Sequence, residues 1–213
     1  MSNELLTSQK YSIPSYMVEG VERARRHIIS SGARWSAAER ADIARVARAA
    51  KAGGDRPTSD LPEHVAKMSE MLAANAHVID QSAVDAFVSQ VGRGAEAYVE
   101  MIGVVARIVA IDTFATGIDA TLVDLTAVDD QAPSGTTREA ARKRSAFVPT
   151  VGPAGATTAL SSVQSEDAAQ EDLHGSLYLS YREMGDLYIE KGLPRWQLEL
   201  IASRTSLINE CFF

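Results

Sequence analysis

The sequence contains a single cysteine and no surplus of positive charge. Because Cys211 is the only cysteine among 213 residues, no disulfide can form within the chain, and this usage fits a reducing compartment. The 21 lysines and arginines are outnumbered by 28 aspartates and glutamates, which gives a net charge of −7. A general nucleic-acid binder normally shows a basic surplus, so we expect no nucleic-acid partner.

The sequence also lacks a long uninterrupted hydrophobic run. Residues 1–10 contain no apolar core of a signal peptide, so the default expectation is a cytoplasmic location. The most hydrophobic segment, residues 98–114, is broken by Glu100, Arg107 and Asp112. These charges leave it well short of the roughly 20 apolar residues that a membrane span requires. We therefore predict a central core helix and no membrane partner.

The rest of the composition is typical of a globular protein rich in helix. Hydrophobic residues make up 46% of the chain and charged residues 23%, which suits one sizeable core or two small ones. Apolar residues recur at helical spacing, and Ser36 with Glu39 forms a capping-box pattern that marks a helix start. The predicted helices cover residues 16–31, 36–52, 61–76, a segment beginning at Asp80, 96–117, 166–191 and 195–213. The predicted fold class is all-α.

Residues 123–164 differ in composition from the helical segments. Proline, glycine and paired aspartates, such as Asp129-Asp130 and Gly152-Pro153, punctuate a stretch with little periodicity. Such a segment is typical of an interdomain connector. Because it is longer than most ordered loops, it either wraps the surface or is mobile.

The last nineteen residues, 195–213, predict an amphipathic helix that carries the cysteine. Leu198, Ile201, Thr205 and Ile208 follow the spacing of one buried helix face. Proline at position 194 precedes the first turn, where its missing N–H does no harm.

This segment resembles a known redox motif. Residues 199–211 match the pattern E-L-x-x-x-x-x-S-x-I-N-x-C of the alkylhydroperoxidase D-like (AhpD-like) and carboxymuconolactone decarboxylase-like superfamily. The matching positions are Glu199, Ser206, Ile208, Asn209 and Cys211, and Glu210 stands where the family usually has glycine. In the family a second cysteine would follow at position 214 and a histidine four residues later. Neither is among the 213 residues.

The resemblance implies a role for each of two matched side chains. In the family, a glutamate feeds a proton relay through the histidine to the second thiol, which attacks the peroxide O–O bond, and the first thiol resolves the product as a disulfide. Glu199 would then be the relay carboxylate and Cys211 the resolving thiol. The attacking group must be a thiolate, because the neutral thiol is a poor nucleophile. Considered without the resemblance, the helix favours an inert thiol at Cys211 and a surface charge at Glu199.

The chain also indicates an internal repeat. Aligning Ile43 with Ile201 places Ala41 opposite Glu199 and Gly53 opposite Cys211, so a first copy would lack both reactive positions. We therefore expect an AhpD-like helical bundle of two repeats, the second of which is incomplete. The expected divisions are a degenerate N-terminal repeat (1–122), a connector (123–164) and the start of a C-terminal repeat that carries the redox-motif helix (165–213).

Two hypotheses account for the position of the last residue. If the next codon were UGA and specified selenocysteine, translation or gene annotation would halt directly after Phe213, and the selenol would be the attacking group. The rival hypothesis is an ordinary truncation. In either case we expect the chain as written to be nearly inactive, because the attacking residue and the relay histidine are missing from it.

Two functional classes remain. The first is a thiol- or selenol-dependent hydroperoxide reductase, a peroxidase-type oxidoreductase that uses a small-molecule hydroperoxide and a thiol reductant. The second is a non-catalytic AhpD-like scaffold or oligomerisation protein, and a decarboxylase is a third option that the cysteine motif disfavours. We expect no cofactor and no metal, since His27, His64, His77 and His174 lack metal-ligand spacing. Because family members usually assemble as oligomers, we predict a homo-oligomer.

Overall fold

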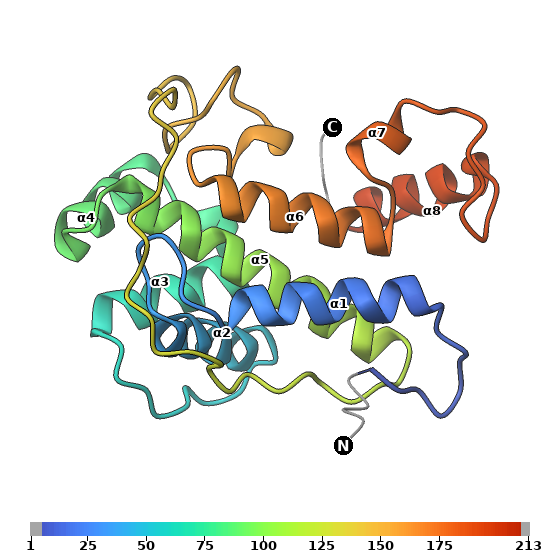
Figure 1. The fold of residues 1–213 in the computed structure, drawn as a ribbon, viewed down its shortest axis with the longest axis horizontal. Coiled ribbons are helices and arrows are strands. Elements are labelled where there is room, and N and C mark those ends of the chain that lie inside the picture. The colour runs from blue at the N-terminus through green and yellow to red at the C-terminus, as the bar shows by residue number, and fades with distance from the viewer. Residues whose placement is uncertain (1–5, 210–213) are drawn as a thin grey trace.

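The protein is an assembly of α-helices around one central helix. The structure, a computed structural model, describes residues 6–209. Within that range the α-helices are α1 (Ser15–Ile28), α2 (Ala37–Lys51), α3 (Glu63–Ala74), α4 (Gln81–Val91), α5 (Ala95–Gly117), α6 (Gln164–Leu177), α7 (Tyr181–Met184) and α8 (Arg195–Ile208), with 3-10 turns at Ala76–Val78 and Ala156–Thr158 (Figure 1). No β-strand occurs among these residues, which confirms the predicted all-α class. None of the helices in this range is long and apolar enough to cross a lipid bilayer.

Helix α5 is the centre of the core, as the hydrophobic segment predicts. Its buried residues extend from Ala97 to Ala115, and helices α1, α2, α3, α4 and α6 all pack against it. A helix that is apolar on nearly every side is stable only when neighbours cover every side. Two charged residues of this helix, Glu100 and Arg107, are fully buried as well, and they define the polar cluster described below.

Local capping signals fix where the helices of the N-terminal half begin and end. At the start of α2 the Ser36 N–H donates to Glu39 Oε2 (2.9 Å) and the Glu39 N–H donates to Ser36 Oγ (3.3 Å), so the predicted capping box is confirmed. Asp80 caps α4 by accepting from the Ala83 N–H (2.9 Å). Gly92 then ends α4 in the left-handed region (φ +64°), where glycine is favoured.

The long connector wraps the surface of the bundle. It passes beside the loop that joins α1 to α2, where the Val128 N–H donates to the Ile29 carbonyl (3.1 Å) and the Gly135 N–H donates to the Ala33 carbonyl (2.9 Å). Apolar side chains along it enter the core, namely Val123, Leu125, Val148, Leu160 and Val163. These buried side chains and backbone bonds explain why a segment without helical periodicity is nevertheless ordered.

The helix predicted over residues 166–191 is wrong beyond Leu177. Helix α6 packs along α1 and ends at Leu177, and the chain then turns into the short helix α7 (Figure 1). A second capping box lies at the start of α7, where the Ser180 N–H donates to Glu183 Oε2 (2.7 Å) and the Glu183 N–H donates to Ser180 Oγ (3.2 Å). The cap starts a new helix and thereby interrupts the earlier one.

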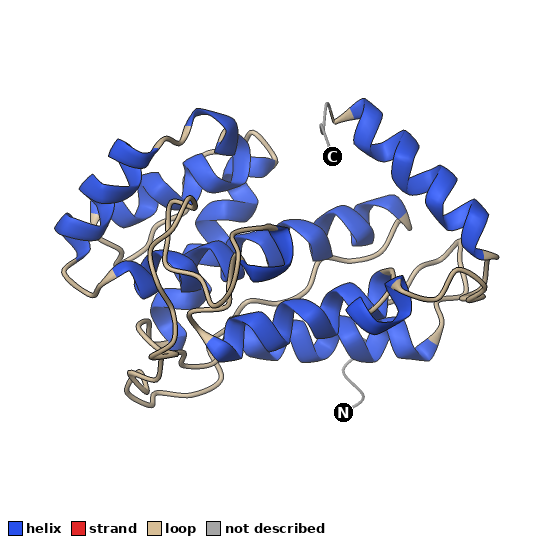
Figure 2. Ribbon diagram, turned by 90° about the horizontal axis from the view of Figure 1, so that it is seen from above, coloured by secondary structure: helices blue, strands red, loops and turns tan. Residues whose placement is uncertain are grey.

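The burial predicted for the C-terminal helix is also wrong. Helix α8 has no buried residue, and four of its large apolar side chains, Leu200, Ile201, Leu207 and Ile208, are between 55% and 68% exposed. No other helix of the described chain packs along it, and Figure 2 shows α8 projecting from the bundle. The amphipathic pattern correctly predicted a helix, but a pattern cannot specify whether a partner surface lies within the same chain.

Candidate functional site

The predicted relay residue, Glu199, lies on the second turn of α8 and is held by two donors. Arg195 Nε donates to Glu199 Oε1 over 2.7 Å, and the Tyr178 hydroxyl donates to the same oxygen over 3.0 Å. The Arg195 guanidinium also donates to the carbonyls of Glu183 (3.3 Å) and Asp186 (3.2 Å), which joins α8 to α7 and to the loop that follows α7. The carboxylate is therefore positioned, although its side chain is 47% exposed.

Tyr178 connects this carboxylate to the end of α6. Burial raises the pKa of the Tyr178 phenol, and its hydrogen bond to Glu199 raises it further, so the hydroxyl stays a donor at neutral pH. The ring of His174 stands edge-on to the Tyr178 ring with 5.6 Å between the ring centroids. His174 Nδ1 instead faces the Leu179 carbonyl oxygen at 2.5 Å. In the part of the chain that the structure describes, no histidine is hydrogen-bonded to Glu199, so a Glu–His relay is not assembled there.

The other predicted site residue, Cys211, lies outside the described residues. Only the sequence relates it to Glu199, twelve positions earlier. Twelve residues of straight helix span about 18 Å, so the two side chains would not touch if α8 simply continued.

A second candidate site, which the sequence reasoning missed, lies in the middle of the bundle. Four charged side chains with 0% exposure meet there: Arg40 from α2, Glu100 and Arg107 from α5, and Glu166 from α6. Arg40 Nη1 donates to Glu100 Oε1 and, over 2.9 Å, to Glu166 Oε1. Arg107 Nη2 donates to Glu166 Oε2. Two positive and two negative groups thus balance each other inside the core.

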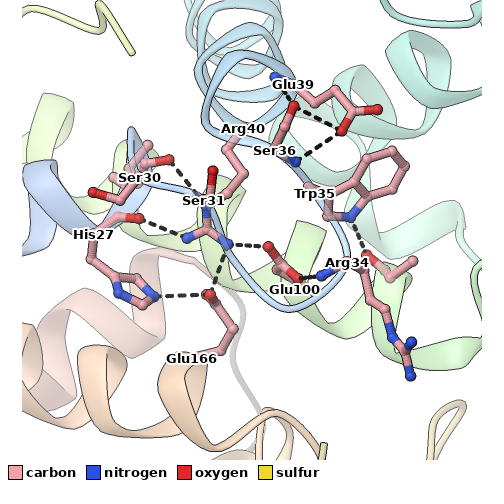
Figure 3. A network of polar contacts seen from close by, with 12 residues as sticks. His27, Ser30, Ser31, Arg34, Trp35, Ser36, Glu39, Arg40, Glu100 and Glu166 are labelled. Carbon is pink, nitrogen blue, oxygen red and sulfur yellow. Dashed lines mark hydrogen bonds and ion pairs between the residues drawn. The ribbon is translucent and has the colours of Figure 1, made fainter. Parts of the chain in front are cut away.

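Backbone groups and one histidine complete this cluster (Figure 3). His27 Nε2 lies 2.9 Å from Glu166 Oε1, and the His27 side chain remains 25% exposed. Arg40 Nη2 donates to the His27 carbonyl over 2.8 Å, and the Arg34 N–H donates to Glu100 Oε2 over 2.6 Å. His27 is therefore the point at which the cluster meets the surface.

Two glycines make room for the buried carboxylates. A Cβ added to Gly32 would overlap Glu100 Oε1, and a Cβ added to Gly103 would overlap Glu166 Oε2. The space that these residues leave empty is the space that the carboxylate oxygens fill. The cluster is therefore built into the backbone as well as into the side chains.

The environment moves the pKa values of the acidic members in opposite directions. Burial by itself would raise the pKa of Glu166, but Arg107, Arg40 and His27 outweigh it, and the pKa lies well below its ordinary value. Burial raises the pKa of Glu100, although Arg40 opposes the rise. Burial also lowers the pKa of His27 against the pull of Glu166, so the imidazole is neutral at pH 7.

Opposed shifts of this kind occur at functional sites and also in structural ion-pair networks. These five side chains include no hydroxyl, thiol or amine nucleophile, and their charged groups are already paired with one another. No group of three or more histidine, cysteine, aspartate or glutamate side chains within residues 6–209 is arranged to hold a metal ion. The cluster therefore has the composition of a structural anchor between α6 and the N-terminal helices.

The sequence does hold a signal for this cluster. Glu100 and Arg107 interrupt the most hydrophobic segment and are seven residues apart, which places them on one helix face two turns apart. Charges on one face of an otherwise apolar helix argue against a membrane span, and they also indicate that charged residues are buried in the core. Their partners, Arg40 and Glu166, could not be assigned without the packing of α2 and α6.

Comparison of the chain with models of known protein families, with curated proteins and with solved structures finds no match.

Proposed function

We propose that this chain is a thiol- or selenol-dependent hydroperoxide reductase-like protein, in which Glu199 begins a proton relay and Cys211 is the resolving thiol. The supporting observation is the geometry of Glu199. Two donors, Arg195 and Tyr178, hold its carboxylate in place at the position that the motif assigns to the relay. A positioned carboxylate with a phenol bound to it is suited to proton transfer.

The helix boundaries also support the repeat on which this proposal rests. Helix α2 begins at Ala37 and α8 begins at Arg195, 158 residues later. The alignment of Ile43 with Ile201 uses the same offset of 158 residues. In that alignment Ala41 takes the place of Glu199, so the N-terminal copy would be chemically silent.

The reaction would proceed in two steps. An attacking thiolate or selenolate breaks the peroxide O–O bond, takes one oxygen as a sulfenic or selenenic acid, and releases the alcohol after the relay delivers a proton. The Cys211 thiol then displaces that oxygen as water and forms a disulfide or selenylsulfide. A thiol reductant restores both groups. The 213 residues supply Glu199 and Cys211 but not the attacking group, so it must be added for a test.

The test compares the 213-residue chain with a version extended by Cys-x-x-x-His after Phe213. We expect thiol-dependent consumption of cumene hydroperoxide only by the extended chain, with dithiothreitol as the reductant. In that chain, Glu199→Gln should lower kcat by about 100-fold or more, the range for loss of general acid–base catalysis. Glu190→Gln, which changes an exposed glutamate before α8, is the matched control and should leave the rate unchanged. An inactive extended chain, or equal rates for the two glutamine variants, would refute the proposal.

A second candidate function is a non-catalytic scaffold or oligomerisation protein, in which α8 mediates self-association. The exposed apolar side chains of α8 favour it, because helices with an apolar stripe normally bury that stripe against a partner. Sedimentation at micromolar concentration should then show a dimer or larger oligomer that Leu200→Glu and Leu207→Glu dissociate. A monomer that gains hydroperoxide reductase activity once the motif is completed would favour the first function alone.

A further inference from the structure

Helices α3 and α4 form a partly open cavity of about 300 Å³ whose lining is mainly apolar. Its walls are His64, Lys67, Met68 and Met71 from α3 and Ala83, Ala86, Phe87 and Gln90 from α4. No aspartate, glutamate or cysteine is among these residues. Neither Glu199 nor any member of the buried charge cluster lines this cavity, so it is a separate feature of the protein.

Three of the lining residues form a set on one face of α3. His64, Met68 and Met71 stand at positions i, i+4 and i+7, which share a face of an α-helix. Met68 is 6% exposed, and Met71 packs against the core. All three side chains line the same cavity. One helix face therefore supplies two thioether sulfurs and one imidazole to a single cavity.

The imidazole of this set has an unused nitrogen. His64 Nε2 is buried and has no hydrogen-bond partner, although the His64 ring lies near the Phe87 ring, with 6.1 Å between centroids. A buried polar atom without a partner is unfavourable, and its most direct remedy is a ligand. In the tautomer protonated at Nδ1, Nε2 offers a lone pair, which is the group by which histidine binds metals.

We propose that this cavity binds a monovalent soft cation, Cu(I), through His64 Nε2 and the sulfurs of Met68 and Met71. Thioether and imidazole ligands favour Cu(I) over hard divalent ions, which prefer carboxylate and carbonyl oxygens. Because the three ligands are uncharged, a monovalent ion leaves less uncompensated charge in the cavity than a divalent ion does. Lys67 also lines the cavity, but it is exposed, and its long side chain can extend the ammonium group into water. Packing of α3 on α4 accounts for the methionines, whereas the unpaired nitrogen needs a partner that the described residues do not supply.

The test measures Cu(I) binding under anaerobic conditions by competition with bicinchoninate. Cys211→Ser serves as the background, because a thiolate also binds Cu(I). This chain should bind one equivalent of Cu(I) and should bind Zn(II) far more weakly. His64→Gln, Met68→Leu or Met71→Leu should weaken Cu(I) binding by at least about tenfold, the smallest loss typical of a perturbed metal site. Met184→Leu, at an exposed methionine outside the cavity, is the matched control.

A second measurement does not depend on the folding of the variants. With methionine methyl groups labelled with ¹³C, Ag(I) serves as a stable substitute for Cu(I). Only the methyl signals of Met68 and Met71 should shift, and those of Met17, Met101 and Met184 should not. Binding that survives all three cavity substitutions, Ag(I) shifts at the other methionines, or Zn(II) binding as tight as that of Cu(I) would overturn the assignment.

Discussion

The buried cluster contains two positive and two negative charges, and replacing Glu166 by glutamine removes one of the negative charges. Glu166 receives hydrogen bonds from Arg40 and Arg107, and among residues 6–209 it is the only carboxylate paired with Arg107. Glutamine has almost the same shape, so it introduces no cavity. The variant therefore isolates the effect of the charge, because Arg107 would stay in the core with only a neutral acceptor.

The magnitude follows from the burial of the partners. Removing one member of a buried ion pair costs about 3–5 kcal/mol, since the remaining charge is left without compensation. The glutamine carbonyl can still accept one hydrogen bond, so we expect a loss of about 3 kcal/mol, the lower end of this range. Against a total free energy of unfolding of about 5–15 kcal/mol, the loss is large enough to measure readily.

The assay is urea denaturation followed by far-ultraviolet circular dichroism and by tryptophan fluorescence, in which buried Trp35 should respond to unfolding more than exposed Trp196. With a slope of about 1–3 kcal/mol per molar urea, the midpoint should fall by about 1 M or more. Glu70→Gln is the matched control, because Glu70 pairs with Arg56 where both side chains are about one-third exposed, and exposed pairs contribute about 0–1 kcal/mol. If the two variants lose equal stability, the cluster does not carry the buried charge that its geometry indicates. Arg107→Met combined with Glu166→Gln should recover much of the loss, because it removes the stranded charge.

Three further predictions test the surroundings of the cluster and one helix end. Gly103→Ala should destabilise the protein by about 1–3 kcal/mol, since the added methyl overlaps Glu166 Oε2, and urea midpoints will show it. The pKa values of His27 and Glu166 are lower in the folded protein than in the unfolded chain, so the unfolded chain binds more protons as the pH falls. Thermal stability should therefore fall as the pH drops below about 6.5, where unfolded histidine titrates, and again below about 4.5, where unfolded glutamate titrates. Glu100, whose pKa is raised, acts in the opposite direction. In Glu166→Gln the loss below about pH 4.5 should become smaller but not vanish, because other carboxylates such as Glu22 and Glu39 also have lowered pKa values. Ser36→Ala should cost about 1 kcal/mol in the same urea assay, because it removes the side-chain acceptor of the capping box on α2.

The sequence was sufficient for features that depend on neighbours along the chain. The capping box at Ser36, the cap at Asp80 and the central helix α5 were all predicted close to their observed positions, because each depends on residues within a few turns. Helix α6 was predicted too long, since the hydrophobic spacing continued past Leu177 while the cap at Ser180 opened a new helix. Local signals of two kinds competed there, and the cap determined the outcome.

Features that depend on distant segments were not predictable in the same way. Glu100 and Glu166 are separated by 66 residues and meet only because α6 packs beside α5. Glu166 itself was unremarkable in the sequence, as one acidic residue in the first turn of a helix, where such residues are common. The exposure of α8 was misjudged for the same reason, since an apolar stripe does not specify which surface covers it.

The buried cluster and the predicted relay residue are connected through α6. Glu166 lies in the first turn of α6 and fixes that end to α2 and α5, whereas Tyr178 caps the other end and donates to Glu199. Between them Arg23 of α1 makes two hydrogen bonds to Asp172 (2.8 and 2.9 Å), which hold the middle of the helix to its neighbour. A helix of 14 residues is about 21 Å long, so the cluster cannot act on Glu199 through space. It acts by fixing the helix from which Tyr178 reaches the carboxylate, and a loosened α6 would therefore release Glu199 from one of its two donors while Arg195, on α8 itself, stayed bound.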